Sequence, residues 1–127
     1  MTPPLPLIAV VDDDLLLLES LENLLESANM QALVFPSAMA LLDSEALPRI
    51  DCLIVDISMP GMDGIELRDR LKVLRPELPL ILITGRHEIA EHLRQHPPAE
   101  PFFRKPFDGR LLLDAIARLV GNPSSKA

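Results

Sequence analysis

The sequence predicts an α/β domain in which a parallel sheet is covered by helices on both faces. Short apolar runs suited to buried strands alternate with longer segments whose apolar residues recur at helical spacing. The length of 127 residues fits one domain with one core. A hydrophobic fraction of 48% and a charged fraction of 24% are close to globular averages, which excludes a wholly disordered or fibrous chain.

The first half of the chain is predicted to alternate strands and helices. Residues 7–11 are apolar and run directly into three aspartates, which is typical of a buried strand that ends in an acidic turn. Residues 15–28 carry leucines at helical spacing with glutamates opposite, which predicts an amphipathic helix that Asp14 can cap. A weaker strand over 32–35, a short helix after Pro36-Ser37 that continues through Leu42, and a buried strand over 51–56 complete this half.

Prolines and glycines set the boundaries in the second half of the chain. A helix over about 65–74 follows a loop with Pro60, Gly61 and Gly64, and it cannot extend through Pro76 and Pro79. The later elements are a strand over 80–83, a helix over about 88–95 that ends before Pro97-Pro98, a brief strand at Phe102-Phe103 and a helix over 109–120 that Asp108 can cap. Because no repeat and no long linker occurs, we expect one domain over residues 1–123 and a frayed tail over 124–127.

The charge and cysteine content narrow the function classes. The net charge is −7, and the sequence contains no basic patch. We therefore expect no direct binding to nucleic acid and no attraction to an anionic membrane. The apolar runs are shorter than a membrane helix needs. A single cysteine, Cys52, cannot form an internal disulfide, and the N-terminus lacks the basic start of a signal peptide. These features favour the cytoplasm.

Polar side chains cluster where the predicted strands end. In an open parallel sheet these carboxyl ends meet at one edge, which is where ligands bind. The side chains delivered to this edge are Asp12, Asp13, Asp56, Thr84 and Lys105. Three crowded carboxylates repel one another, and a hard divalent cation such as Mg²⁺ relieves that repulsion. A lysine and a hydroxyl beside the ion suit a phosphoryl group, which an oxygen of Asp56 could accept covalently.

Four short motifs follow one another in an order and spacing that are highly specific together. They are VVDDD at 10–14, DISMPGMDG at 56–64, TG at 84–85 and FFRKPF at 102–107. Over nearly its whole length the chain resembles the receiver domain of bacterial two-component response regulators. The resemblance implies a flavodoxin-like sheet of five parallel strands in the order 2-1-3-4-5. It also implies a phosphorylation-dependent signalling switch that receives its phosphoryl group from a sensor histidine kinase or a phosphotransfer protein.

The resemblance implies a role for each metal ligand. Asp56 corresponds to the phosphoacceptor and also ligates Mg²⁺. Asp13 corresponds to the direct metal ligand and Asp12 to its water-mediated neighbour. Ser58 corresponds to the residue whose backbone carbonyl completes the protein's share of the coordination shell.

The resemblance also implies the residues that hold the phosphoryl group and transmit the signal. Lys105 corresponds to the lysine that pairs with a phosphoryl oxygen, and Thr84 to the hydroxyl that moves toward it. Phe102 falls at the position of a switch aromatic that turns inward once Thr84 is drawn away. The Lys105-Pro106 bond resembles the family's cis peptide, and X-Pro bonds are the usual place for a cis linkage.

One segment departs from the family pattern. Between Thr84 and Lys105 the family usually has a longer helix and then a Gly-Ala pair, whereas residues 86–101 of this chain lack that pair and contain Pro97, Pro98 and Pro101. We therefore expect the helix and strand that relay the signal to differ in length and mobility.

Two rival functions remain open on the sequence alone. A degenerate receiver would bind partners without being phosphorylated, and the altered 86–101 segment is its support. A haloacid-dehalogenase-type phosphatase also uses an aspartate nucleophile and Mg²⁺, and Asp12-x-Asp14 imitates its DxD start. However, Leu16 stands where that enzyme needs a hydroxyl. We therefore expect no enzyme in the usual sense, but a phosphoacceptor that assists its own phosphorylation and dephosphorylation.

Three further features are weaker signals. His92 and His96 share a helix face, but two histidines without a third ligand are more often surface residues, so no zinc site is expected. Cys52 lies in an apolar strand and is expected to be an inert buried thiol. In the last helix Leu112 and Ile116 point inward by spacing and Leu111 points outward, which suggests a homodimer or another partner contact through this helix and its neighbouring surface.

Overall fold

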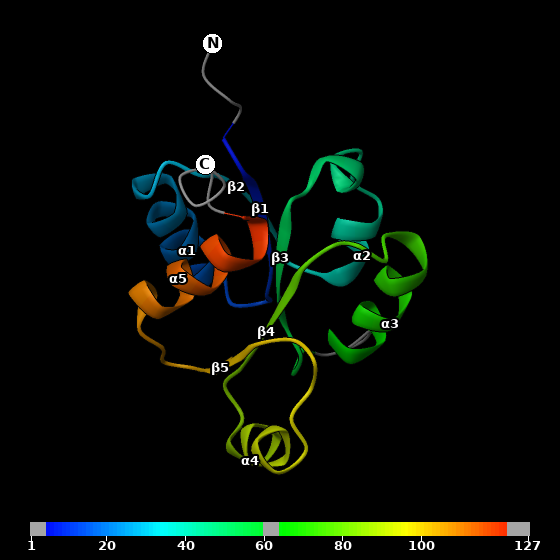
Figure 1. The fold of residues 1–127 in the computed structure, drawn as a ribbon, viewed down its shortest axis with the longest axis vertical. Helices are drawn as coiled ribbons and strands as arrows, with labels where there is room; N and C mark the ends of the chain where they lie inside the picture. The colour runs from blue at the N-terminus through cyan, green and yellow to red at the C-terminus, as the bar shows by residue number, and fades with distance from the viewer. Residues whose placement is uncertain (1–4, 60–63, 122–127) are drawn as a thin grey trace.

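A computed structural model of the chain describes residues 5–59 and 64–121, and it consists of a five-stranded parallel sheet flanked by helices (Figure 1). The strands are β1 (Leu7–Val11), β2 (Gln31–Phe35), β3 (Cys52–Asp56), β4 (Leu80–Thr84) and β5 (Phe102–Arg104). The helices are α1 (Leu15–Ser27), α2 (Ala38–Leu42), α3 (Gly64–Leu74), α4 (His87–Gln95) and α5 (Gly109–Val120), with one 3₁₀ turn η1 (Leu47–Arg49). Every strand pair is parallel and the order is β2-β1-β3-β4-β5, which confirms the predicted α/β class and the implied order.

The three central strands are buried along their whole length, because helices cover both faces of the sheet. Alternate side chains of β1 serve the two faces. Ile8 and Val10 pack with the inward leucines of α1 and with Leu112 and Ile116 of α5. The other face packs against α2 and α3 through Leu41, Leu67 and Leu71. Figure 1 shows α1 and α5 on one side of the sheet and α2 and α3 on the other.

Helix α4 lies apart from these two layers, below the β4 and β5 edge of the sheet in Figure 1. Its Leu93 packs with Leu82, Ile57 and the half-buried Phe102 in a small apolar cluster. Strand β5 is only three residues long and pairs with β4 alone. The other edge strand, β2, pairs with its neighbour over five residues, whereas β5 pairs over three. The β5 corner is therefore the less constrained edge of the sheet.

The predicted helix caps are confirmed. The side chain of Asp14 accepts hydrogen bonds from the backbone N–H groups of Leu16 and Leu17, and Asp108 accepts one from Arg110. Gly121 follows α5 with a φ of 73°, a left-handed conformation that glycine adopts without a steric penalty. Since these caps need only local side chains, the sequence predicts them directly.

Several boundaries differ slightly from the sequence prediction. Strand β4 extends to Thr84 and α4 begins at His87, one residue earlier than expected. The turn η1 was not predicted, and it is held by a distant side chain: the Arg75 Nη1 donates to the carbonyls of Leu47 at 2.9 Å and Ile50 at 2.6 Å. The expected tail over 124–127 and the loop residues Pro60 and Gly61 lie outside the described residues. No helix within the described ranges is long and apolar enough to cross a membrane.

We predict that Gly64→Ala destabilises the fold, because α3 begins in direct contact with the end of β3. A Cβ atom at Gly64 would lie 2.6 Å from the Cα of Ile57 and 2.7 Å from the carbonyl oxygen of Asp56. Relief requires a backbone shift, so we expect a loss of about 1–3 kcal/mol in the free energy of unfolding, measured with urea. Gly85→Ala is the control, since its Cβ would meet only the Lys105 Cδ at 3.5 Å. Equal unfolding midpoints for the two variants would contradict this packing argument.

Candidate functional site

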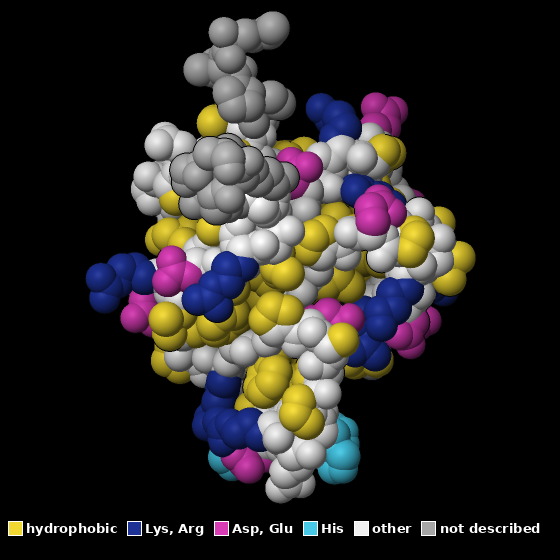
Figure 2. Space-filling model, in the orientation of Figure 1, with side chains coloured by type: hydrophobic (Ala, Val, Ile, Leu, Met, Phe, Trp, Pro, Cys, Tyr) yellow, Lys and Arg dark blue, Asp and Glu magenta, His cyan; other side chains and the backbone are white. Residues whose placement is uncertain are grey.

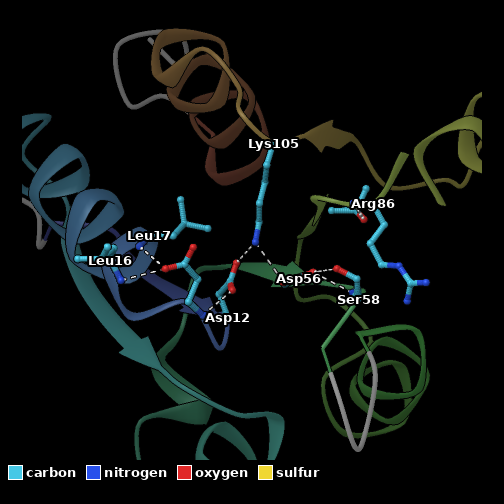
Figure 3. Close-up of polar contacts among 9 residues, drawn as sticks. Asp12, Leu16, Leu17, Asp56, Ser58, Arg86 and Lys105 are labelled. Atoms are coloured by element: carbon cyan, nitrogen blue, oxygen red, sulfur yellow. Dashed lines mark hydrogen bonds and ion pairs between the residues drawn. The ribbon is translucent and has the colours of Figure 1, made fainter. Parts of the chain in front are cut away.

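Four strands deliver polar side chains to one edge of the sheet, as Figure 3 shows. Asp12 directly follows β1 and its backbone N–H donates to the carbonyl of Phe35 at 3.1 Å, which fixes the turn. Asp56 and Thr84 are the last residues of β3 and β4. The side chains of Asp12, Asp56 and Thr84 are all buried, and Asp12 has no exposed surface. Burial is unusual for the two carboxylates.

Lys105 links two of these carboxylates. Its ammonium nitrogen lies 2.7 Å from Asp12 Oδ2 and 3.2 Å from Asp56 Oδ2, and the side chain extends between the two residues in Figure 3. The backbone also holds it in place, because the Lys105 N–H donates to the Thr84 carbonyl at 2.8 Å. The Lys105–Pro106 peptide bond is cis, as the resemblance implied.

Asp13 completes an acidic cluster with Asp12 and Asp56. One carboxylate oxygen of each residue lies within 4.8 Å of the others. Asp13 is exposed to solvent and the other two aspartates are buried. Among the described residues, the buried Asp12 Oδ2 has its ion pair with Lys105 but no well-directed hydrogen bond. Three carboxylate oxygens this close together form a set of hard ligands, and such a set fits a divalent cation such as Mg²⁺.

Asp56 is held from the loop side by Ser58. Its Oδ1 accepts one hydrogen bond from the Ser58 backbone N–H at 2.8 Å and a second from the Ser58 hydroxyl at 2.6 Å. Its Oδ2 faces Lys105. The sequence suggested a role only for the backbone carbonyl of Ser58. The side-chain contact could have been anticipated from the tendency of Ser and Asp to bond locally in turns.

Burial and charge act in opposite directions at this site. Burial raises the pKa of Asp12 from 3.8 to about 6, although the neighbouring Lys105 ammonium opposes the shift. For Lys105 itself, burial lowers the pKa, but the carboxylates of Asp12 and Asp56 outweigh burial and raise the pKa overall. The ammonium therefore stays charged at neutral pH, and it is the cation that holds the two buried acids together.

Thr84 lies beside Lys105 at this edge of the sheet, whereas Phe102 lies away from the acids. The buried Thr84 hydroxyl oxygen accepts a hydrogen bond from the Arg86 backbone N–H at 3.1 Å. The Arg86 side chain extends away from Lys105 in Figure 3. It pairs with Glu88 at 2.9 Å. Phe102 is not among the acids, since it packs beside α4. The structure therefore brings Thr84 to the site and leaves Phe102 on the path from the site toward α4.

The weaker sequence signals lie outside the site. His92 and His96 stack with ring centroids 4.8 Å apart on α4. Within the described ranges, the aspartate cluster is the one group of three or more His, Cys, Asp and Glu side chains with metal-binding geometry. Cys52 is fully buried, and burial raises the pKa of its thiol to about 12, which agrees with an inert residue.

Comparison with known proteins identifies the family. The family model for the response regulator receiver domain matches residues 8–117. The chain belongs to the receiver-domain family of response regulators. The predicted class of signalling domain is thereby confirmed, and neither the phosphatase nor the degenerate receiver is favoured.

Individual relatives agree with this assignment. The receiver domain is 34% identical over 125 residues to the transcriptional regulatory protein FixJ of Bradyrhizobium diazoefficiens, covering 94% of this chain and 60% of that protein. It is 36% identical over 110 residues to the response regulator protein TmoT of Ectopseudomonas mendocina, covering 86% of this chain and 50% of that protein. The chain thus spans about half the length of the curated relatives it matches.

The fold agrees as well. A receiver domain protein from Clostridium thermocellum superposes with a TM-score of 0.80 at 25% identity, over 97% of this chain and all of that one. Receiver domains as a family act with histidine kinases or phosphotransfer proteins and are not enzymes in the usual sense.

We predict a pH-dependent stability that Asp12 controls. Because the pKa of Asp12 is higher in the folded state, its protonated form stabilises the fold below pH 3.8, and that contribution is lost as the pH rises through about 6. In metal-free buffer, the free energy of unfolding of the wild type should therefore fall by on the order of 2 kcal/mol between pH 3.8 and about 6. Asp12→Asn should not show this fall, because its amide does not titrate. Urea unfolding across this pH range measures it. Identical pH profiles for the variant and the wild type would contradict the assignment.

Proposed function

We propose that this receiver domain is switched by transfer of a phosphoryl group to Asp56 with Mg²⁺ bound beside it. The observation that carries the proposal is the position of the Lys105 ammonium, which lies 3.2 Å from the carboxylate of Asp56. Asp56 belongs to the cluster of three aspartates. An ammonium at this distance is suited to neutralise a phosphoryl oxygen in transfer. The buried Thr84 hydroxyl supports the same role, because it ends the neighbouring strand and can donate a hydrogen bond.

The transfer step balances without any further reactant. A carboxylate oxygen of Asp56 forms a bond to phosphorus, and the bond from phosphorus to the imidazole nitrogen of a phosphohistidine breaks. The nitrogen keeps the electron pair of that bond, and because the other ring nitrogen of the phosphohistidine carries a proton, the donor leaves as a neutral imidazole. Lys105 offsets the negative charge on the equatorial oxygens, and the Thr84 hydroxyl donates a hydrogen bond to one of them.

The residues proposed to hold the cation are Asp13 and Asp56 directly, Asp12 through water, and Ser58 through its backbone carbonyl. The closeness of one carboxylate oxygen from each of the three aspartates, all within 4.8 Å of one another, supports this set. When bound, Mg²⁺ supplies positive charge to the three carboxylates and the incoming phosphoryl group. The same residues would assist the return reaction, in which a water oxygen bonds to phosphorus and Asp56 leaves as a carboxylate with inorganic phosphate released.

The signal would leave the site through β4 and β5. Thr84 gives up its contact with the Arg86 N–H when it turns toward the phosphoryl group, and Phe102 moves into the space near α4. The altered 86–101 segment is tied to α3 at its far end, since Glu100 pairs with Arg68 at 3.3 Å and Lys72 at 3.5 Å. These ion pairs support a relay in which α4 moves while the end of the following loop stays anchored.

The partners are proposed from the same chemistry. A sensor histidine kinase or a phosphotransfer protein would supply the phosphoryl group in the cytoplasm. We also propose that the domain comprises residues 1–123 of the chain. The matched part makes up about half of the length of these relatives.

Self-association through α5 is a second proposed contact. Leu111 is 56% exposed, whereas the adjacent Leu112 is fully buried. A shallow hollow beside Leu111 is lined by Asp108, Arg110 and Asp114 as well. Charges of both signs around an exposed leucine are self-complementary, so the helix of a second copy can pair with it about a two-fold axis.

We predict that Asp56→Asn abolishes phosphorylation. With Mg²⁺ and a small acyl phosphate, intact mass should show one added phosphoryl group on the wild type and none on the variant, because an amide is too weak a nucleophile. Asp69→Asn is the matched control, since that carboxylate is exposed on α3. Persistence of the added mass in Asp56→Asn would refute the phosphoacceptor assignment.

We predict that Leu111→Lys weakens self-association of the phosphorylated domain, because it places a charge in the centre of the proposed contact. Sedimentation velocity over a range of protein concentrations measures the effect. Val73→Lys serves as the control, since Val73 is 82% exposed on a different helix. Unchanged sedimentation of Leu111→Lys would remove α5 from the proposed interface.

A further inference from the structure

The Asp56 carboxylate is already engaged on both of its oxygens. Oδ1 accepts from the Ser58 N–H at 2.8 Å and from the Ser58 hydroxyl at 2.6 Å, and Oδ2 faces the Lys105 ammonium at 3.2 Å. A carboxylate oxygen has two lone pairs. Both lone pairs of Oδ1 are therefore occupied by donors from one residue, whereas Oδ2 has one left.

The function proposed above needs both oxygens. One forms the bond to phosphorus and the other ligates the cation. Whichever oxygen takes which part, Oδ1 has to lose one of its two donors. The backbone N–H is fixed by the turn that follows β3, but the hydroxyl can leave by rotation about a single side-chain bond. The Ser58 hydroxyl is therefore the donor that has to move.

We propose that the Ser58 hydroxyl competes with the cation and the phosphoryl group for Asp56 Oδ1, and so favours the free carboxylate. This inference rests on the proposed function. Its physical basis is that a hydroxyl bonds more strongly to a charged carboxylate than to the carbonyl oxygen of an acyl phosphate. The hydroxyl therefore stabilises the state before transfer and the carboxylate that leaves in hydrolysis. The side chain acts oppositely to the backbone carbonyl of the same residue, which is proposed to bind the cation.

Removing the hydroxyl should tighten Mg²⁺ binding. In Ser58→Ala, water replaces the hydroxyl at Oδ1, and water is displaced more easily than a donor held in place by the chain. We expect the Mg²⁺ dissociation constant to fall about three- to tenfold, as the net contribution of one ordinary hydrogen bond implies once water takes the place of the hydroxyl. Ser58→Thr, which keeps the hydroxyl, should restore the wild-type value.

The binding should be measured by isothermal titration calorimetry with Mg²⁺ alone, because the chain has no Trp and no Tyr to report binding by intrinsic fluorescence. Ser27→Ala is the matched control, since it removes a serine hydroxyl that bonds to the Leu24 carbonyl in α1, away from the site. Circular dichroism establishes that each variant is folded. A Ser58→Ala protein that binds Mg²⁺ no more tightly than the wild type overturns the inference.

A second measurement addresses the phosphorylated state. The half-life of the acyl phosphate, followed by intact mass after removal of the donor, should lengthen in Ser58→Ala and return to the wild-type value in Ser58→Thr. A half-life that is unchanged or shorter in Ser58→Ala overturns the inference. Failure of the wild type itself to take up a phosphoryl group refutes the proposed function instead, and the Mg²⁺ comparison then decides the role of Ser58 without phosphorylation.

Discussion

The mutual repulsion of three carboxylates at one edge of the sheet is the constraint on which the rest of this structure depends. Asp12 and Asp56 are buried, so each must be offset by a cation or a proton. Lys105 offsets part of this charge in the described structure, while burial and, to a smaller extent, the charge of Asp56 raise the pKa of Asp12. A site balanced in this way responds strongly to any added charge, which is what a switch driven by phosphate and a dication requires.

The scaffold makes that balance possible because it is rigid where the acids stand. Strands β1, β3 and β4 are buried on both faces, and α3 begins against the backbone of β3 with no room for a side chain on Gly64. By contrast, β5 is short, half-buried and paired on one side only. The aspartates therefore follow or end the buried strands β1 and β3, whereas Lys105 follows the less constrained edge strand β5. A change of charge at the site can move β5 and α4 more easily than it can move the aspartates.

Local chemistry explains why most of the fold could be predicted. Asp14 and Asp108 cap their helices through hydrogen bonds to residues two or three positions away, and Gly121 ends α5 by its own backbone freedom. The 3₁₀ turn at Leu47–Arg49 was missed because its partner is Arg75, which is distant in the sequence. The ion pairs of Glu100 were not predicted for the same reason, since its partners Arg68 and Lys72 belong to α3, about thirty residues earlier in the sequence.

For the site, the sequence by itself determined which side chains reach the edge of the sheet, because strand ends in a parallel sheet converge and four of the five strands end in, or run directly into, a polar residue. Only the tertiary structure decided how they interact. Three-dimensional packing sets the burial that raises the pKa of Asp12 and places the Lys105 ammonium between two carboxylates. Burial, distance and direction arise from segments far apart in the chain, so no local pattern of residues encodes them.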